Sequence, residues 1–351
     1  MPQSSLSPVE LYYTRCGSAT ASALAIRKNW LQEEFAKPGT LLHSLRDSHS
    51  LAVRNSHYNH SQTGMFREGG NIPPLWAKGQ GQDTVVIAIT WLDEYQGILT
   101  RAGSGIKTLA DLKGKRLGVP LHRNAVIDFQ RGAAQHGYET ALKLEGLSVQ
   151  DVILVDLVAS SYDSEDGPRQ VRTGEPRNIE LTALDNGEVD AIFLRFARGF
   201  RASKDERYHE VININDLKDP LLRVNNGTPR PVTVDRAFLK KHPDIVVRYL
   251  TVLLRAAAWA AEHHDEVLDL LAPEDGGSTR DDILGSHGEN VHLSFTPKLS
   301  DEYIQGLNVQ KNFLRDWGYI TRDYDVNDWI DPNPLAEAEK IVAAEKSSKV
   351  A

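Results

Sequence analysis

The chain is poor in cysteine and in long apolar runs. Cys16 is the one cysteine in 351 residues, which excludes an intramolecular disulfide and gives no sign of adaptation to an oxidising compartment. No run of about 18 apolar residues, the length that spans a membrane, occurs. The first eight residues lack the basic start and apolar stretch of a secretory signal. We therefore expect a cytoplasmic protein without a membrane partner.

A basic excess is absent as well. The formal net charge is -8, from 40 Lys and Arg against 48 Asp and Glu. This balance argues against nucleic acid or an anionic membrane as a partner, so any anion must be held by a few local cations. A chain of 351 residues with 40% hydrophobic side chains is long enough for two hydrophobic cores.

The order of the predicted elements is typical of an α/β protein with two lobes. Strands predicted at residues 11–14 and 39–45 flank a helix over residues 19–31, for which Ser18 would be the N-cap. The apolar, β-branched run over residues 85–90 predicts a strand covered on both faces, central in the first lobe.

Chain breakers suggest where the two lobes are connected. Gly103-Ser104-Gly105 is the first candidate crossing, and the chain is expected to return near residues 225–227. The predicted first lobe therefore comprises residues 1–103 and 228–351 and carries the cysteine. The second lobe comprises residues 104–227.

Cys16 lies where the first predicted strand meets the first predicted helix. The unpaired N–H groups at a helix start favour a thiolate over a thiol, which would make the side chain reactive. A lone free cysteine is more often a small buried apolar side chain. Position alone leaves both interpretations open.

A predicted polar loop precedes Gly70 and contains His57, His60 and Arg67. Glycines followed by prolines over residues 69–74 predict a turn that leads into a helix start, which is a geometry suited to anions, with Arg67 beside it. Arg67 could equally be a surface residue after a turn. His57 and His60 have an H-x-x-H spacing, but no carboxylate or cysteine completes a zinc shell, so we expect no metal.

Two further cations could face a ligand between the lobes. Arg123 follows the first strand of the second lobe, at the strand end where ligands of open α/β sheets bind; the alternative is a solvated residue at a helix start. Arg195 and Arg198 follow a strand predicted at residues 190–194. If the chain continued extended, both could face the ligand and favour a second anionic group; the alternative is that both face solvent.

The segments Thr108–Val119 and Asp185–Ile192 resemble the type II periplasmic solute-binding fold, in the branch related to sulfonate- and thiamine-precursor-binding proteins. The resemblance covers about residues 9–330. It implies a two-lobed α/β fold with a cleft between the lobes.

A narrower resemblance rests on Tyr13–Cys16, His57-Tyr58 and Arg67–Leu75, which are similar to motifs of the aromatic sulfinate desulfinases of dibenzothiophene desulfurisation. These enzymes have the solute-binding fold, are cytoplasmic and use no cofactor. The resemblance implies catalytic roles for Cys16, His57 and Arg67. Substrate contacts are expected from Gly69, Gly70 and Tyr58, with Arg123 and Arg195 added on their chain position.

The chemistry requires these residue types. Cleaving an aryl carbon–sulfur bond needs a proton at the ring carbon or a nucleophile for sulfur, and cysteine can supply either. An arginine with backbone N–H groups can hold the sulfinate oxygens. The sequence thus predicts a desulfinase-like hydrolase acting on a small aromatic anion. The alternatives are a solute-binding protein for a sulfonate or carboxylate, and a cytoplasmic ligand sensor; the aryl group and the oligomeric state stay open.

Overall fold

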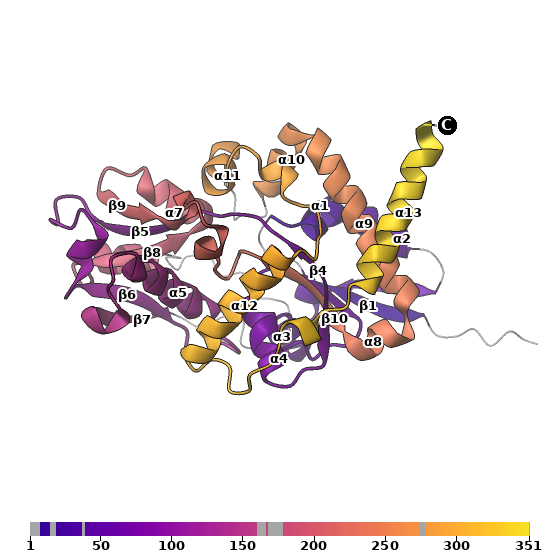
Figure 1. Cartoon of the computed structure of the whole chain (residues 1–351), viewed down its shortest axis with the longest axis horizontal. Helices are drawn as coiled ribbons and strands as arrows, with labels where there is room; N and C mark the ends of the chain where they lie inside the picture. The colour runs from indigo at the N-terminus through magenta and orange to yellow at the C-terminus, as the bar shows by residue number, and fades with distance from the viewer. Residues whose placement is uncertain are drawn as a thin grey trace, which may run out of the picture.

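Two five-stranded sheets form the centres of two lobes (Figure 1). The computed structural model describes residues 8–14, 19–36, 39–159, 166–167, 178–273 and 278–350. In spatial order the first sheet consists of β2 (Thr40–Ser44), β1 (Val9–Tyr13), β3 (Met65–Glu68), β10 (Arg230–Asp235) and β4 (Thr84–Thr90). The second consists of β7 (Ile153–Val158), β6 (Arg116–Leu121), β8 (Ala191–Arg195), β5 (Gln96–Arg101) and β9 (Tyr208–Asn213).

Helices cover both sheets. Those of the second lobe are α5 (Phe129–Leu144), α6 (Ile179–Asp185) and α7 (Phe196–Ser203). Those that precede or follow it in the chain are α1 (Ala21–Arg27), α2 (Trp30–Phe35), α3 (Leu51–Asn59), α4 (Ile72–Gly79), α8 (Arg236–Lys241), α9 (Pro243–Glu262), α10 (His264–Leu271), α11 (Arg280–His287), α12 (Asp301–Asp316) and α13 (Asn333–Val350). No helix of the described chain is both long and apolar enough to cross a membrane. The predicted α/β, two-lobed organisation is therefore confirmed.

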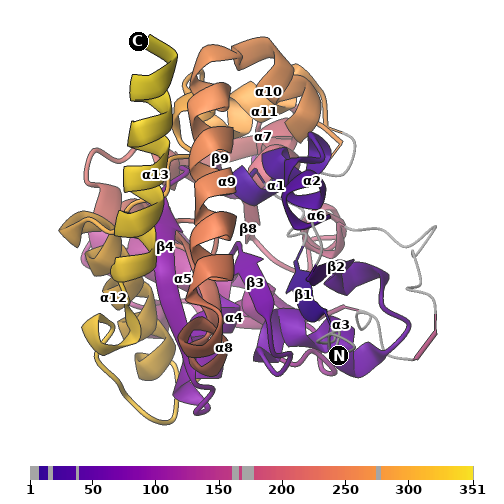
Figure 2. The same cartoon turned by 90° about the vertical axis from the view of Figure 1, so that its right-hand side faces the viewer.

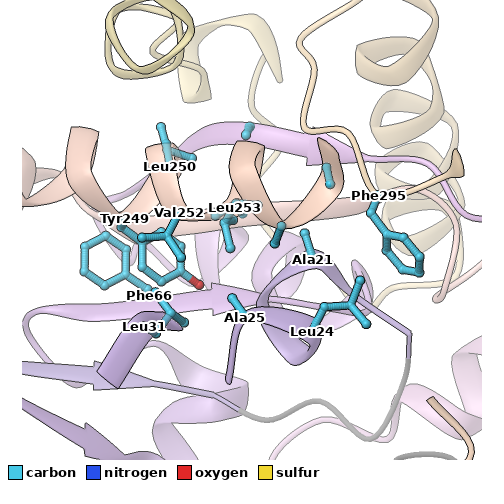
Figure 3. Packing of buried hydrophobic residues seen from close by; sticks show 14 of the residues in the cluster. Ala21, Leu24, Ala25, Leu31, Phe66, Tyr249, Leu250, Val252, Leu253 and Phe295 are labelled. Atoms are coloured by element: carbon cyan, nitrogen blue, oxygen red, sulfur yellow. The ribbon is translucent and has the colours of Figure 1, made fainter. Parts of the chain in front are cut away.

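The core of the first lobe lies between its sheet and α1 and α9 (Figure 3). Leu24 and Ala25 of α1 face Leu253 of α9, and the Phe66 ring of β3 stacks on Tyr249 with 4.1 Å between ring centroids. The small side chains of α1 allow it to approach α9 closely. Figure 2 shows α13 running beside α9 on the outside of this lobe.

The predicted helix over residues 19–31 is two helices. Asn29 has a left-handed backbone conformation, with φ 60°, and separates α1 from α2; asparagine tolerates this conformation better than most residues. Thr20 is the N-cap of α1, and its hydroxyl accepts a 3.0 Å hydrogen bond from the Ala23 N–H. Ser18, the predicted N-cap, lies outside the described residues.

Strand β4 is fully buried as predicted, but it is at the edge of its sheet and not at the centre. Its free edge is covered by the C-terminal part of the chain, where the Ile89 N–H donates to the Lys298 carbonyl and the Asp331 N–H donates to the Val86 carbonyl. Covering an edge in this way allows an edge strand to be as apolar as a central one.

The first connection between the sheets differs from the prediction. Strand β5, placed by sequence in the first lobe, pairs with β8 and β9 of the second sheet. The first crossing is therefore at residues 91–95, and Gly103–Gly105 is a turn after β5. This crossing could not be predicted from the sequence, because strands lie on both sides of it and residues 91–95 contain no glycine or proline. The chain returns between β9 and β10.

Candidate active site

The ends of β1 and β3 bring two of the predicted segments together. The strands are parallel, Tyr13 is paired with Phe66, and the Thr14 N–H donates to the Phe66 carbonyl at 3.2 Å. Arg67, the residue after Phe66 in β3, therefore lies next to the point where the chain leaves β1 at Thr14. Cys16 lies two residues beyond Thr14 in the sequence and is outside the described residues.

Arg67 is held against the helix that carries His57. Its side chain is 1% exposed, and its Nε donates to the His57 carbonyl oxygen at 2.9 Å. His57 belongs to the last turn of α3, so the predicted loop before Gly70 is wrong at this point. Ser50 caps α3, with its hydroxyl accepting from the Val53 N–H at 3.4 Å, which explains why a polar segment forms a helix. The structure therefore brings His57 and Arg67 together.

His60, the second histidine of the H-x-x-H spacing, has a different environment. It is buried, and its Nε2 lies 3.2 Å from the Thr233 hydroxyl. Burial, and then the nearby Arg67 guanidinium, lower the pKa of His60 to about 3. His60 is consequently neutral across the physiological range. Within the residues that are described, no three His, Cys, Asp or Glu side chains are grouped to hold a metal ion.

Tyr58 forms an aromatic contact between the lobes. Its ring packs edge-on against His57, with 4.8 Å between centroids, and stacks with Phe129 of α5, with 6.2 Å between centroids. Phe129 was not recognised from sequence, where it is one of many apolar residues at a helix start. Arg123 is exposed on the loop between β6 and α5 and is not brought into this cluster.

Gly69 and Gly70 form the predicted turn into α4, with prolines in its first turn. The start of α4 is already capped, however. The Asn226 side-chain oxygen accepts from the Ile72 N–H at 3.0 Å, and its carbonyl accepts from the Asn71 N–H at 2.7 Å. A Cβ on Gly70 would lie 2.7 Å from the Asn226 amide nitrogen, so glycine is required for this approach. An anion at the turn would have to use the glycine N–H groups.

Two buried groups near these residues were missed. The Glu68 carboxylate, 1% exposed, accepts from the Ser22 N–H at 2.7 Å and from the Thr90 hydroxyl at 3.0 Å, so it caps the start of α1. The sequence signal that could have pointed to Glu68 was a second charged residue directly beside Arg67. The Thr14 hydroxyl is buried and has no hydrogen-bond partner among the residues that the structure describes.

Arg195 and Arg198 do not form a pair of free cations. Arg195 precedes α7 and binds the buried Glu94 through its Nε at 2.6 Å, whereas Arg198 lies in α7 and binds Glu180 at 2.9 Å. The two arginines are three positions apart, so even an extended chain would direct them to opposite faces. The expectation that both favour a second anionic group on the ligand is therefore wrong.

A surface groove of about 490 Å³ lies elsewhere, between α8, α9 and the start of α13. It is lined by apolar side chains such as Leu239 and Val247 and by charged ones such as Lys240 and Glu337. None of the predicted site residues lines it.

The comparison with protein families identifies the chain. A model described as "NMT1/THI5 like" matches residues 72–267, which is more than half of the sequence. The chain belongs to the NMT1/THI5-like family. This places it among the relatives of solute-binding proteins, as the resemblance of the segments Thr108–Val119 and Asp185–Ile192 implies.

Relatives with assigned names fall into two groups. The chain is 25% identical over 312 residues to the 2'-hydroxybiphenyl-2-sulfinate desulfinase of Rhodococcus erythropolis, covering 80% of this chain and 82% of that protein. It is also 25% identical over 283 residues to a Bacillus subtilis protein named for binding aliphatic sulfonates, covering 78% of this chain and 71% of the relative.

Solved structures include members of both groups. A mutant of the desulfurization enzyme DSZB in complex with biphenyl-2-sulfinic acid matches with a TM-score of 0.74 and 22% identity, over 94% of this chain and 99% of that one. The periplasmic aliphatic sulphonate binding protein SsuA of Escherichia coli matches with a TM-score of 0.65 and 18% identity, over 93% and 98%. The predicted type II solute-binding-protein fold is confirmed for this member of the NMT1/THI5-like family.

Proposed function

We propose that this protein is a desulfinase-type hydrolase that cleaves the carbon–sulfur bond of an aromatic sulfinate. In the overall reaction, ArSO2⁻ and water give ArH and HSO3⁻. One proton of water replaces sulfur on the ring carbon, and the hydroxyl oxygen is transferred to sulfur. No redox step is needed, so atoms, charge and electrons balance without a cofactor.

The main observation in support is the pairing of β1 with β3, which brings the strand leading to Cys16 beside the buried Arg67. Arg67 is in turn bound to the backbone of His57. The residues of the desulfinase motif that lie in the described chain thus converge from separate elements. The 25% identity to the Rhodococcus desulfinase over 80% of the chain supports the same assignment.

Each group has a role in the proposed reaction. Arg67 and the Gly70 N–H hold the sulfinate oxygens, and Tyr58 contacts the aromatic ring. In the first route the Cys16 thiol protonates the ring carbon, after which water hydrates the released SO2. In the second route the thiol proton goes to the ring carbon as the Cys16 sulfur bonds to the sulfinate sulfur, and water then hydrolyses the resulting Cys–S–SO2⁻ to HSO3⁻ and the free thiol. His57 returns the proton in the first route and orients the water in the second.

The second candidate is a binding protein for a sulfonate anion. It is favoured by the likeness in fold to the sulfonate-binding proteins and by the identity to the Bacillus subtilis relative. Arg67 and the glycine turn would then hold a sulfonate group, and Cys16 would have no chemical role. A binding protein is expected to take up aryl sulfonates with saturable affinity and to release no sulfite from sulfinates.

The decisive experiment is sulfite release from biphenyl-2-sulfinate by the wild-type protein and by Cys16→Ser. We expect wild-type turnover and a loss of at least tenfold in the variant, about 1.4 kcal/mol or more in the barrier, because a hydroxyl is a far weaker acid and nucleophile than a thiol. Binding of biphenyl-2-sulfonate should be retained in both. A serine variant that keeps more than about a tenth of the rate would remove Cys16 from the chemistry.

A further inference from the structure

The side-chain amide of Asn226 lies against the glycine turn that leads into α4. Asn226 belongs to the connection that returns from the second lobe, and the residue is 6% exposed. An added Cβ on Gly70 would lie 2.7 Å from the Asn226 Nδ2 atom and 2.8 Å from its Oδ1 atom. Because Gly70 has no side chain, the amide can lie beside the turn at which the proposed function places an anion.

The orientation of this amide follows from its contact with α4. The Oδ1 atom accepts a 3.0 Å hydrogen bond from the Ile72 N–H. An N–H donor must face the oxygen of the amide, so the NH2 group is on the other side. Among the residues that the structure describes, Nδ2 forms no hydrogen bond. Most buried polar groups have a partner, so an oriented and largely buried donor beside Gly70 indicates a ligand.

The backbone around Asn226 is held on both sides. Its carbonyl accepts from the Asn71 N–H at 2.7 Å, and its own N–H donates to the Asn225 side-chain oxygen at 2.7 Å. Asn225 exchanges backbone hydrogen bonds with Thr228 at 2.9 and 3.0 Å, and its Nδ2 donates to the Ala133 carbonyl of α5 at 3.1 Å. A donor that is already held in place loses little freedom on binding, which favours affinity.

The charged groups beneath this turn do not oppose an anion. The Glu94 carboxylate lies over Gly227, where an added Cβ would clash with it. Its Oε2 lies 3.5 Å from Nη2 of Arg230, and its Oε1 accepts from Nε of Arg195 at 2.6 Å. One carboxylate between two guanidinium groups leaves this cluster with a net positive charge, which is attractive to an anion.

We propose that Asn226 is an anion-binding residue, whose Nδ2 group donates to an oxygen of the sulfinate or sulfonate held at the Gly69–Gly70 turn. The proposal rests on the anion site of the proposed function. It adds to that site a donor that neither the desulfinase motif nor the family match identifies. It holds whether the bound anion is cleaved or only carried.

The test separates the donor from the cap of α4. In Asn226→Asp a carboxylate oxygen still accepts from the Ile72 N–H, so the helix start stays capped, but the NH2 donor is replaced by a negatively charged oxygen. The dissociation constant of biphenyl-2-sulfonate is measured by isothermal titration calorimetry, with thermal unfolding in parallel. The matched control is Asn59→Asp, which adds the same charge at the end of α3 and keeps an oxygen that accepts from the Ser61 N–H.

The dissociation constant should rise about tenfold or more in Asn226→Asp, as expected for a lost hydrogen bond to a charged group. The melting temperature should stay within about 3 °C of wild type. The dissociation constant of Asn59→Asp should stay within about threefold of wild type. If Asn226→Asp does not fold, Asn226→Ser decides by the same criterion, because its hydroxyl can still cap Ile72. A smaller rise in the folded variant, an equal rise in the control, or a wild-type protein that does not bind the sulfonate would overturn the proposal.

Sulfite release gives the second measurement. In Asn226→Asp, kcat/KM for biphenyl-2-sulfinate should fall about tenfold or more, because the same oxygen contact is lost. Sulfite release by the variant at the wild-type efficiency would contradict this contact. If the wild-type protein binds the sulfonate but releases no sulfite, the proposed enzymatic function fails, and the dissociation constants still decide the role of Asn226.

Discussion

The Arg67 guanidinium is held by a hydrogen bond to the backbone of His57. Its Nε donates to His57, and its side chain is 1% exposed. We expect Arg67→Lys to lower kcat/KM for an aryl sulfinate at least tenfold, about 1.4 kcal/mol or more, because an ammonium cannot bond His57 and two sulfinate oxygens in one plane. Steady-state kinetics measure the effect. Arg198→Lys, which changes a paired arginine of α7, is the control, and equal kinetics in both variants would exclude Arg67 from the site.

Arg195 and Arg198 also lead to an expectation about the substrate. Because Glu94 and Glu180 neutralise them, neither side chain is available to hold a second anionic group. A carboxylated aryl sulfinate should therefore have no advantage over the plain compound, with kcat/KM ratios within about threefold and no change of the ratio in Arg198→Ala. Competition between the two compounds tests this. A strong preference for the carboxylated one that disappears in Arg198→Ala would show that the ion pair opens for the ligand.

At the scale of elements, the start of α1 depends on a carboxylate from β3. Glu68 accepts from the Ser22 and Ala21 N–H groups and from Thr90, out of contact with water. In Glu68→Gln the side-chain NH2, a donor, would face backbone N–H groups that are also donors. The free energy of unfolding should therefore fall by about 1.5–3 kcal/mol. Urea denaturation measures the loss.

Thr20→Ala provides the control for Glu68, because it removes the N-cap hydroxyl of the same helix and should cost about 1 kcal/mol. If Glu68→Gln costs no more than this cap, the carboxylate is not what fixes α1 to β3.

The elements differ in how far the sequence predicts them. Strand β1, helix α4 with its prolines and the apolar strand β4 follow from local patterns, because their signals lie within a few residues. The edge position of β4 and the partners of Arg195 could not be predicted. Both depend on residues that are distant in sequence, such as Lys298 beside Ile89 and Glu94 beside Arg195. Helix α3 was not predicted, because its residues are mostly polar. Ser50, its N-cap, was the sequence signal for a helix start at this position.

At the scale of the whole molecule, three described histidines are buried in a neutral form. The pKa of His60 and that of His287 are lowered to about 3, and the pKa of His136 to about 4, in each case mainly by burial. In the unfolded chain these groups have pKa values of about 6.5. Between pH 6.5 and 4 the unfolded state therefore binds more protons than the folded state.

Stability should consequently fall as the pH decreases through this window. Each of the three histidines contributes a slope of about 1.4 kcal/mol per pH unit near pH 5. Urea unfolding at pH 7, 6 and 5 measures the slope in wild type and in His136→Gln, which retains side-chain polarity without the titration. We expect the variant to show a slope shallower by about 1 kcal/mol per unit, averaged over this range. Identical slopes would mean that His136 is already accessible to protons in the folded state.

The C-terminal helices join the two lobes in a further way. Helix α12 packs on α4 and β4 of the first lobe and also contacts α5 of the second (Figure 1). At α5, the Phe313 ring stacks on His136 with 4.3 Å between ring centroids, and Gln310 forms a hydrogen bond with the same histidine ring. Helix α11 likewise packs on α7, with Asp282 bound to Arg201 at 3.0 Å.

Each sheet is thus completed by helices encoded far from its strands. A gene fragment encoding residues 96–213 would produce the whole second sheet but leave the surfaces of α5 and α7 uncovered. Such a fragment is expected to aggregate on expression. Attempts to divide this protein for separate production or for split-reporter assays should keep residues 280–317 with the second lobe.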